Sequence, residues 1–152
     1  GTLPPGSLAY VSEEVFADLG AIENDGLADQ FDLGLTASDH PPFTGRFLKN
    51  PLCGRWTDLP SVRGATVNGI SSNAMRVKMI TQKYQPALES MEGAAVHYVC
   101  LVENIPFIQL RAVSNFAGER DKKNWKITEA IRHLNEHLIH MLQYPATGLS
   151  NS

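Results

Sequence analysis

The sequence predicts a single α/β domain, a three-layer α/β/α sandwich with a mixed, largely parallel sheet. Its second half alternates short β-rich runs with longer helical patterns, which is the order typical of layered α/β folds. Residues 106–114 are almost continuously apolar, as expected of a central strand covered on both faces. Apolar side chains between residues 127 and 142 share one stripe when wound at about 100° per residue, which predicts the closing helix. The stripe consists of Ile127, Ala130, Ile131, Leu134, Leu138, Met141 and Leu142.

The first half of the chain offers few regular elements. Residues 7–12 have a strand pattern, whereas residues 16–21 are too short and irregular to assign. The Asn-Asp-Gly sequence at residues 24–26 signals a turn. Four of the nine prolines fall within residues 39–62, which we expect to form a long irregular connection.

The second half is more regular. Residues 64–70 form a β-rich run, and the polar cluster at 71–73 is a good N-cap for a helix over 74–83. A short strand is predicted at 88–91. The following segment, 93–103, is apolar almost all round, so we expect a deeply buried helix.

Composition argues against several classes of protein. Thirteen basic residues face sixteen acidic ones, which gives a net charge of −3 and leaves no basic surplus for binding nucleic acid. No apolar run approaches the roughly 18 residues of a membrane helix. The first six residues lack the basic flank and the apolar region of a signal peptide. Cys53 and Cys100 are too few for a disulfide framework, and they fit a reduced, cytoplasmic protein.

A metal-binding pattern occurs in the closing helix. His133, Glu136 and His137 match the H-x-x-E-H order of inverted zincins, in which two imidazoles one turn apart share a metal. No third ligand cluster follows, and the three side chains fall outside the apolar stripe. A solvated helix face is the better interpretation, so we predict no metal site and no other cofactor.

Two strand ends carry the candidate binding residues, because ligands of open α/β sheets bind at the carboxyl ends of strands. Met91 and Glu92 close the strand at 88–91, and Ser114 and Asn115 close the strand at 106–114. Glu92 could accept hydrogen bonds from two vicinal hydroxyls, as in ribose binding, or it could only favour the helix start. Asn115 alone is better explained as a turn residue.

The residues at the two strand ends, taken together, indicate a protein family more specifically than either end does alone. The sequence Ser-Met-Glu-Gly-Ala-Ala at 90–95, a buried helix, and Leu-Arg-Ala-Val-Ser-Asn at 110–115 resemble the nucleoside phosphorylase/nucleosidase family. The likeness covers roughly residues 65–142, and residues 3–11 also look like a family passage. Residues 16–21 are similar to a stretch of the futalosine hydrolases of menaquinone biosynthesis, which is the branch that the sequence resembles most.

The resemblance implies a purine nucleosidase of the phosphorylase/hydrolase-like fold that acts on a small-molecule nucleoside. The reaction would be hydrolysis of the N-glycosidic bond of a 6-oxopurine nucleoside, specifically futalosine, to hypoxanthine and dehypoxanthine futalosine. Glu92 would bind the ribose 2′- and 3′-hydroxyls, and Met91 would pack against the sugar. Ser114 and Asn115 would face the purine, and Glu92 and Asn115 would be the catalytic pair.

Asn115 is the residue that discriminates between substrates. Adenine-specific members of the family carry Asp at this position. An Asn amide donates to O6 of a 6-oxopurine while its oxygen accepts from a protonating N7. Three alternatives stay open: a 6-oxopurine nucleoside phosphorylase, a protein like the 5′-methylthioadenosine/S-adenosylhomocysteine nucleosidases, and a non-catalytic nucleobase-binding module.

The sequence also departs from the family. Ser72 and Asn73 fall in the substrate-binding region, where the family's base-stacking aromatic residue is missing. The family's N-terminal strands, which supply a glycine-rich segment and a water-activating Glu, have no counterpart before residue 7. Glu13 and Glu14 are expected to be exposed turn acids. We therefore expect residues 1–152 to form one N-terminally truncated nucleosidase domain that is nearly inactive alone, and a homo-oligomer of two or more copies.

Overall fold

The computed structural model describes residues 3–23, 26–55 and 58–144, and it confirms the predicted α/β fold. The elements in chain order are β1 Leu8–Phe16, β2 Gly20–Glu23, β3 Gly26–Asp29, β4 Leu48–Lys49, β5 Ser61–Thr66, α1 Ala74–Tyr84, β6 Leu88–Ser90, α2 Gly93–Val102, β7 Leu110–Ala112 and α3 Ile127–Gln143, with short 3₁₀ helices at Cys53–Arg55 and Lys122–Asn124. The main sheet has the order β4-β1-β5-β6, and β7 also pairs with β1. A second sheet consists of the β2–β3 hairpin.

β1 is the strand around which the main sheet is built. It runs parallel to β5 from Tyr10 to Phe16, with an irregularity between Val11 and Glu13. β7 pairs antiparallel with the beginning of β1, and β4 pairs antiparallel with its later part. β6 extends the sheet parallel to β5. The predicted strand at 7–12 therefore continues to Phe16.

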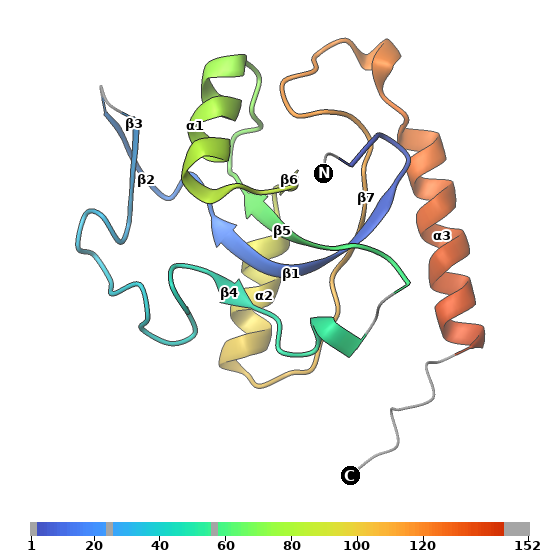
Figure 1. Cartoon of the computed structure of the whole chain (residues 1–152), viewed down its shortest axis with the longest axis horizontal. Helices are drawn as coiled ribbons and strands as arrows, with labels where there is room; N and C mark the ends of the chain where they lie inside the picture. The colour runs from blue at the N-terminus through green and yellow to red at the C-terminus, as the bar shows by residue number, and fades with distance from the viewer. Residues whose placement is uncertain (1–2, 24–25, 56–57, 145–152) are drawn as a thin grey trace.

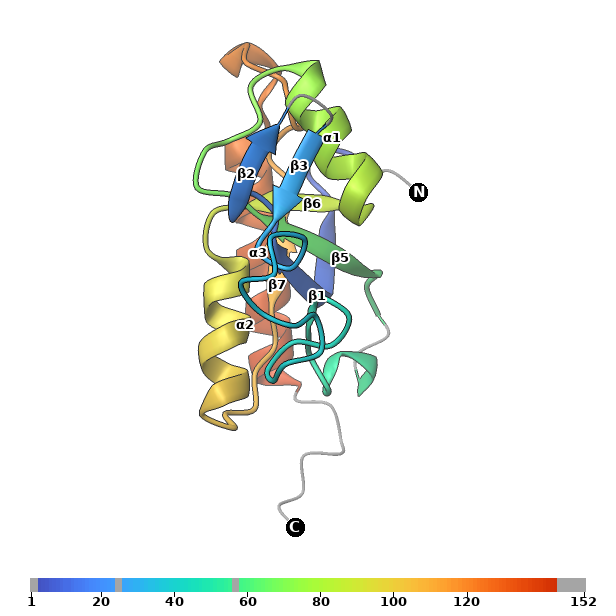
Figure 2. The ribbon, with the colours of Figure 1, turned by 90° about the vertical axis from the view of Figure 1, so that its left-hand side faces the viewer.

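The helices lie against this sheet (Figure 1). α2 packs across β1, β4 and β5, and α3 packs along β7 and β1. The β2–β3 hairpin contacts α1, and Figure 2 shows it facing the viewer, in front of the main sheet. The turn signal at residues 24 and 25 lies outside the described residues, but the flanking strands pair antiparallel from Glu23 and Gly26 onward.

The core joins β1, β5 and α1. Its buried side chains are Val15, Ala17, Ala65, Val67, Ile80 and Tyr84. α1 begins where the N-cap cluster predicted, because the Asn73 side chain accepts a hydrogen bond from the Arg76 backbone amide. The described residues of 39–55 and 58–62 are irregular as expected, apart from β4, one 3₁₀ helix and the start of β5.

The strand predicted at 106–114 is wrong in length, direction and place. Only residues 110–112 form β7, which is antiparallel to β1 and pairs with no other strand among the described residues. Before β7 the chain is held by separate contacts. Val11 donates its amide to the Gln109 carbonyl at 2.9 Å, and the Asn50 side chain donates to the Phe107 carbonyl at 3.1 Å. The apolar run therefore reflects packing on α2, where Phe107 meets His97 edge to face.

α2 is less buried than predicted. Only Gly93, Ala94 and His97 are buried, while Val96 and Val102 are about half exposed and Val99 is 54% exposed. Its sequence is apolar all round, but in the described residues the sheet covers only one side of the helix. No helix in the described part of the chain is long and apolar enough to cross a bilayer.

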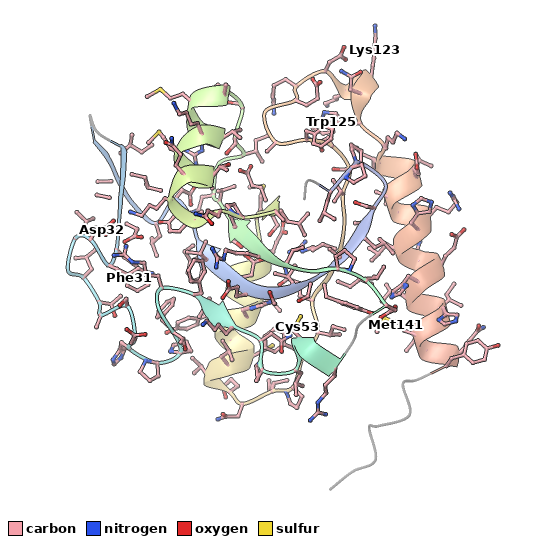
Figure 3. The ribbon with its side chains drawn as sticks, in the orientation of Figure 1. Phe31, Asp32, Cys53, Lys123, Trp125 and Met141 are labelled. Atoms are coloured by element: carbon pink, nitrogen blue, oxygen red, sulfur yellow. The ribbon has the colours of Figure 1, made fainter. Side chains whose placement is uncertain are left out.

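α3 turns only part of the predicted stripe toward the sheet. Ala130 is buried, and the sulfur of Met141, which Figure 3 labels, accepts from the Tyr10 hydroxyl at 3.7 Å. Ile131 is half exposed and Leu142 is 82% exposed. Polar contacts also lie on the inner side of α3. His133 Nδ1 lies 2.6 Å from the Gly6 carbonyl oxygen, so the imidazole side of the helix faces the beginning of β1.

A buried acidic cluster ties the hairpin to α1. Asp29 is 1% exposed, and the Tyr84 hydroxyl donates to it at 2.9 Å, as does the Arg46 guanidinium. Burial opposes ionisation of Asp29, but hydrogen bonds from the Asp32 backbone, Tyr84 and Arg46 outweigh it and hold the pKa of Asp29 below its ordinary value. Lys83 pairs with Asp32 at the edge of the cluster.

We predict that Tyr84→Phe lowers the free energy of unfolding by about 1.5–3 kcal/mol, because it removes a hydrogen bond to a buried carboxylate. Chemical denaturation measures the loss. Tyr98→Phe is the matched control, since its ring contacts with Phe16 and Phe43 persist. Equal stability losses in the two variants would contradict this account.

Candidate active site

A cavity of about 400 Å³ lies between the ends of β6 and β7, a volume that suits a small-molecule ligand. Met91 and Glu92, which follow β6, form part of its wall. Ser114 and Asn115, which follow β7, form another part. The structure thus brings the two predicted segments to one cavity.

The two segments meet for a different reason from the one predicted. We expected two neighbouring parallel strands to end at the same edge, but β7 is antiparallel to β1 and is not paired with β6. Arg111 of β7 bridges the gap instead. Its guanidinium donates to Ser90 Oγ at 3.3 Å and lies 3.5 Å from the Glu92 carboxylate.

Glu92 is the residue immediately before α2. Its side chain makes no capping hydrogen bond to the helix and is 68% exposed. The carboxylate is therefore not engaged by the helix start, and Arg111 is its ion-pair partner. Its oxygens can accept hydrogen bonds from the hydroxyls of a ligand.

Asn115 sits in a local hydrogen-bonded turn. Its amide nitrogen donates to the Phe116 carbonyl at 3.0 Å, and its oxygen accepts from the Ser114 hydroxyl at 2.6 Å. An Asn amide has a second N–H and a second lone pair, so these contacts leave one donor and one acceptor for a ligand. The turn role and the binding role of Asn115 are therefore compatible.

Ser72 and Asn73 lie away from this group. Neither lines the 400 Å³ cavity, whereas the neighbouring Ser71 does. Asn73 caps α1 and lines a second cavity of about 220 Å³ beside Asp18 and Arg76. Ser71 is held by Glu89, whose carboxylate accepts from both the amide and the hydroxyl of Ser71 at 2.8 and 2.6 Å.

Two aromatic residues of the cavity were not predicted. Phe116 and Trp125 line it, and Figure 3 shows Trp125 on the connection between β7 and α3. The Trp125 indole donates to the Glu119 carbonyl at 3.2 Å, which orients the ring. The connection is polar and basic in sequence, so the position of one Trp within it was the only available signal.

Glu14 was expected to be an exposed turn acid, and this is wrong. It lines the cavity and is 1% exposed. Thr66 Oγ1 donates to it at 3.0 Å and Gln109 Nε2 at 2.7 Å. Burial raises the pKa of Glu14, although these two hydrogen bonds and Arg111 oppose the shift.

Glu13, on the other face of β1, forms an ion pair with Arg63 at 2.6 Å. Because β1 continues past residue 12, strand alternation places the two carboxylates on opposite faces.

The H-x-x-E-H residues of α3 have separate partners. The His137 imidazole lies 3.1 Å from the Tyr10 hydroxyl, and His133 contacts the Gly6 carbonyl. The expectation that both histidines lie on a solvated face is therefore wrong. Glu136 pairs with Arg132 on the exposed side. Across the described residues, no group of three or more His, Cys, Asp or Glu side chains is placed to hold a metal ion.

No family model matches the chain, but individual proteins do. The chain is 33% identical over 137 residues to a futalosine hydrolase of Streptomyces coelicolor, which covers 88% of this chain and 56% of the relative. A futalosine hydrolase of Thermus thermophilus is 36% identical over 133 residues, with coverages of 85% and 58%. The solved S-adenosylhomocysteine nucleosidase of Streptococcus pyogenes, in complex with 5-methylthiotubericidin, matches with a TM-score of 0.69 at 18% identity, over 95% of this chain and 63% of that one.

The fold is that of the nucleosidases. The structural likeness decides this, and the sequence identities confirm the predicted resemblance to futalosine hydrolases. The chain spans about half the length of the curated relatives that it matches.

We predict that native stability, relative to a Glu14→Gln variant, falls as the pH rises from about 4.5 toward neutrality. The raised pKa of Glu14 makes protonation favour the folded state, so this contribution is complete below the ordinary value of 4.5 and is lost as the pH rises through the raised value. Urea unfolding at a series of pH values measures the difference. Glu13→Gln is the control on the same strand, and a difference for Glu14→Gln that does not change with pH would contradict the burial effect.

Proposed function

We propose that the protein hydrolyses the N-glycosidic bond of a 6-oxopurine nucleoside, and that this nucleoside is futalosine, in menaquinone biosynthesis. The observation that carries the proposal is the cavity whose wall contains both Glu92 and Asn115. The products are hypoxanthine and dehypoxanthine futalosine. The sequence likeness to two futalosine hydrolases supports this choice of substrate.

Glu92 acts on the sugar in this proposal. Its carboxylate accepts hydrogen bonds from the ribose 2′- and 3′-hydroxyls, and Met91 packs against the ring. As the bond from C1′ to the base breaks, its electron pair leaves with the base and positive charge develops on the ribose. A carboxylate beside the sugar stabilises that charge, and Arg111, 3.5 Å from the Glu92 carboxylate, is its ion-pair partner in the absence of substrate. A water molecule then bonds to C1′ and releases a proton to solvent, which balances the proton that the departing base takes up from solvent.

Asn115 acts on the base. Its amide nitrogen donates to O6, and its oxygen accepts from N7 as that nitrogen takes up a proton. Phe116 and Trp125 supply apolar surface for the purine ring. Asn115 has no proton to transfer, so it stabilises the departing base without acting as a general acid.

The decisive experiment supplies the intact protein with futalosine, inosine and 5′-methylthioadenosine, with and without phosphate. We expect hypoxanthine from futalosine at a rate independent of phosphate. Phosphate-dependent formation of a sugar 1-phosphate would indicate a phosphorylase. Cleavage of 5′-methylthioadenosine in preference to futalosine would indicate an adenine-specific nucleosidase, and binding without turnover would indicate a nucleobase-binding module.

We further propose that the protein is a cytoplasmic homo-oligomer. The exposed valines of α2 form an apolar helix face that a second copy would cover. Cys53 and Cys100 are free thiols, as expected in a reducing compartment. Sedimentation equilibrium tests the assembly, and a monomer at micromolar concentration would contradict it.

We predict that Glu92→Ala lowers kcat/KM for futalosine at least tenfold, because it removes hydrogen bonds to a charged acceptor worth about 1.5–3 kcal/mol each. Steady-state kinetics on the intact enzyme measure the effect. Glu103→Ala, at the other end of α2, is the matched control and should leave kcat/KM unchanged. A loss below tenfold for Glu92→Ala would exclude the ribose role.

We predict that Asn115→Asp shifts preference from 6-oxopurine toward adenine nucleosides. The exchange swaps the donor and acceptor that face position 6 of the purine, and a mismatch between buried polar groups gives strong discrimination. The ratio of kcat/KM for futalosine to that for 5′-methylthioadenosine reports the shift. The exposed Asn104→Asp is the control, and an unchanged ratio would mean that Asn115 only shapes the turn.

A further inference from the structure

One buried acid of the cavity has no part in the proposed reaction. Glu14 lines the cavity, yet it is 1% exposed and each of its oxygens accepts a hydrogen bond from the protein. A carboxylate so enclosed does not reach a ligand or an attacking water. Its contacts must explain why a costly buried acid is placed there.

One oxygen of Glu14 is linked to the start of α2. Thr66 Oγ1 donates to Glu14 Oε2 at 3.0 Å, and the same Thr66 oxygen accepts from the Ala94 amide at 2.7 Å. Ala94 lies in the first turn of α2, two residues after Glu92. A single hydroxyl therefore connects the buried carboxylate to the backbone that carries Glu92.

The other oxygen is linked to the segment that enters β7. Gln109 Nε2 donates to Glu14 Oε1 at 2.7 Å, and Gln109 itself is buried. Gln109 directly precedes Leu110, the first residue of β7, which carries Arg111 and leads to Asn115. Both walls of the cavity are thus connected to the same carboxylate.

Two glycines let the backbone close around Glu14. A Cβ atom at Gly64 of β5 or at Gly93 of α2 would overlap the Glu14 carboxylate. Gly93 immediately follows Glu92, so the first residue of α2 rests directly on Glu14. Displacing this carboxylate would displace the beginning of the helix.

We propose that Glu14 is a positioning residue, which holds Glu92 and Asn115 at the separation that a nucleoside requires. This inference rests on the proposed nucleosidase function. Glu14 acts through Thr66, Gln109 and Gly93, and it does not touch the substrate. Its hydrogen bonds, and not its negative charge, do the positioning.

A neutral amide can replace the carboxylate because polar atoms near it lack hydrogen-bond partners. Gln109 Oε1 and His97 Nε2 are both buried without a hydrogen-bond partner among the described residues. His97 Nδ1 donates to the Leu48 carbonyl at 2.9 Å, which leaves Nε2 as an acceptor in the neutral ring. In Glu14→Gln, we expect the new oxygen to accept from Thr66 and the new nitrogen to donate to Gln109 Oε1. This requires the Gln109 amide to turn, so that its nitrogen donates to Nε2 of His97, with which Gln109 interacts.

The experiment compares Glu14→Met, which keeps the length but removes both acceptors, with Glu14→Gln and with Glu13→Met as the control on the opposite face of β1. In the intact protein we expect Glu14→Met to lower kcat/KM for futalosine by about ten- to a hundredfold, as misplacement of a binding group by an ångström does. Amide hydrogen exchange at residues 93–96 should become faster in the same variant. Glu14→Gln should lose no more than about threefold, within the context dependence of hydrogen-bond energies, and Glu13→Met should match the native protein.

Two outcomes would overturn the inference. Loss of activity in Glu14→Gln as severe as in Glu14→Met would mean that the charge itself takes part in the reaction. Native kinetics and native exchange in Glu14→Met would mean that Glu14 positions nothing. If Glu14→Met fails to fold, Thr66→Val and Thr66→Ser replace it, with activity retained only where the hydroxyl is kept.

The two proposals fail separately. If the native protein does not cleave futalosine, the proposed function is wrong, and exchange at residues 93–96 still decides the role of Glu14. If the native protein is active and exchange is unchanged in Glu14→Met, the positioning role alone is wrong.

Discussion

The arrangement of the main sheet depends on which strands pair with the two edges of β1. β5 pairs with one edge through most of the strand, so β4 and β7 divide the other between them. β7 pairs antiparallel with Leu8–Tyr10 only, so it is short. The chain then leaves β7 toward β6, where Arg111 spans the remaining distance to Ser90 and Glu92. The cavity lies between the ends of β6 and β7, which are not paired with each other.

Two buried carboxylates stabilise this arrangement by different means. Asp29 is surrounded by donors that include the cations of Arg46 and Lys83, and these favour its ionised form despite burial. Glu14 has a hydroxyl and an amide as its nearest donors, so burial dominates and favours the protonated form. Asp29 therefore works as the centre of an ion-pair network, whereas Glu14 works as a hydrogen-bonding junction between secondary-structure elements.

The parts of the fold that local patterns encode were predictable. Asn73 signalled the start of α1 through its capping chemistry, and Pro-rich composition signalled the irregular residues 39–62. The proximity of Met91-Glu92 to Ser114-Asn115, which line one cavity, was predictable because the two motifs occur together at a family spacing. Pairing partners leave no local pattern, so the direction of β7 was not predictable from its apolar run.

The same limit explains why the burial of Glu14 and the inner face of α3 were not predicted. Whether an acid after a strand is exposed depends on where the strand ends, and β1 ends four residues later than its apolar pattern. In α3, His133 and His137 share the inner side of the helix with only part of the apolar stripe, and they contact the Gly6 carbonyl and the Tyr10 hydroxyl. Long-range polar contacts of this kind become visible only in three dimensions.

Trp125 gives the cavity an optical property of its own. The indole lines the wall and is oriented by the Glu119 carbonyl, so its emission senses the polarity of the cavity. Trp56 is the other tryptophan of the chain, and replacing it by Phe would leave Trp125 as the single fluorophore of its kind. The cavity therefore contains a built-in reporter whose intensity and wavelength can follow occupation in real time, without a label and without turnover.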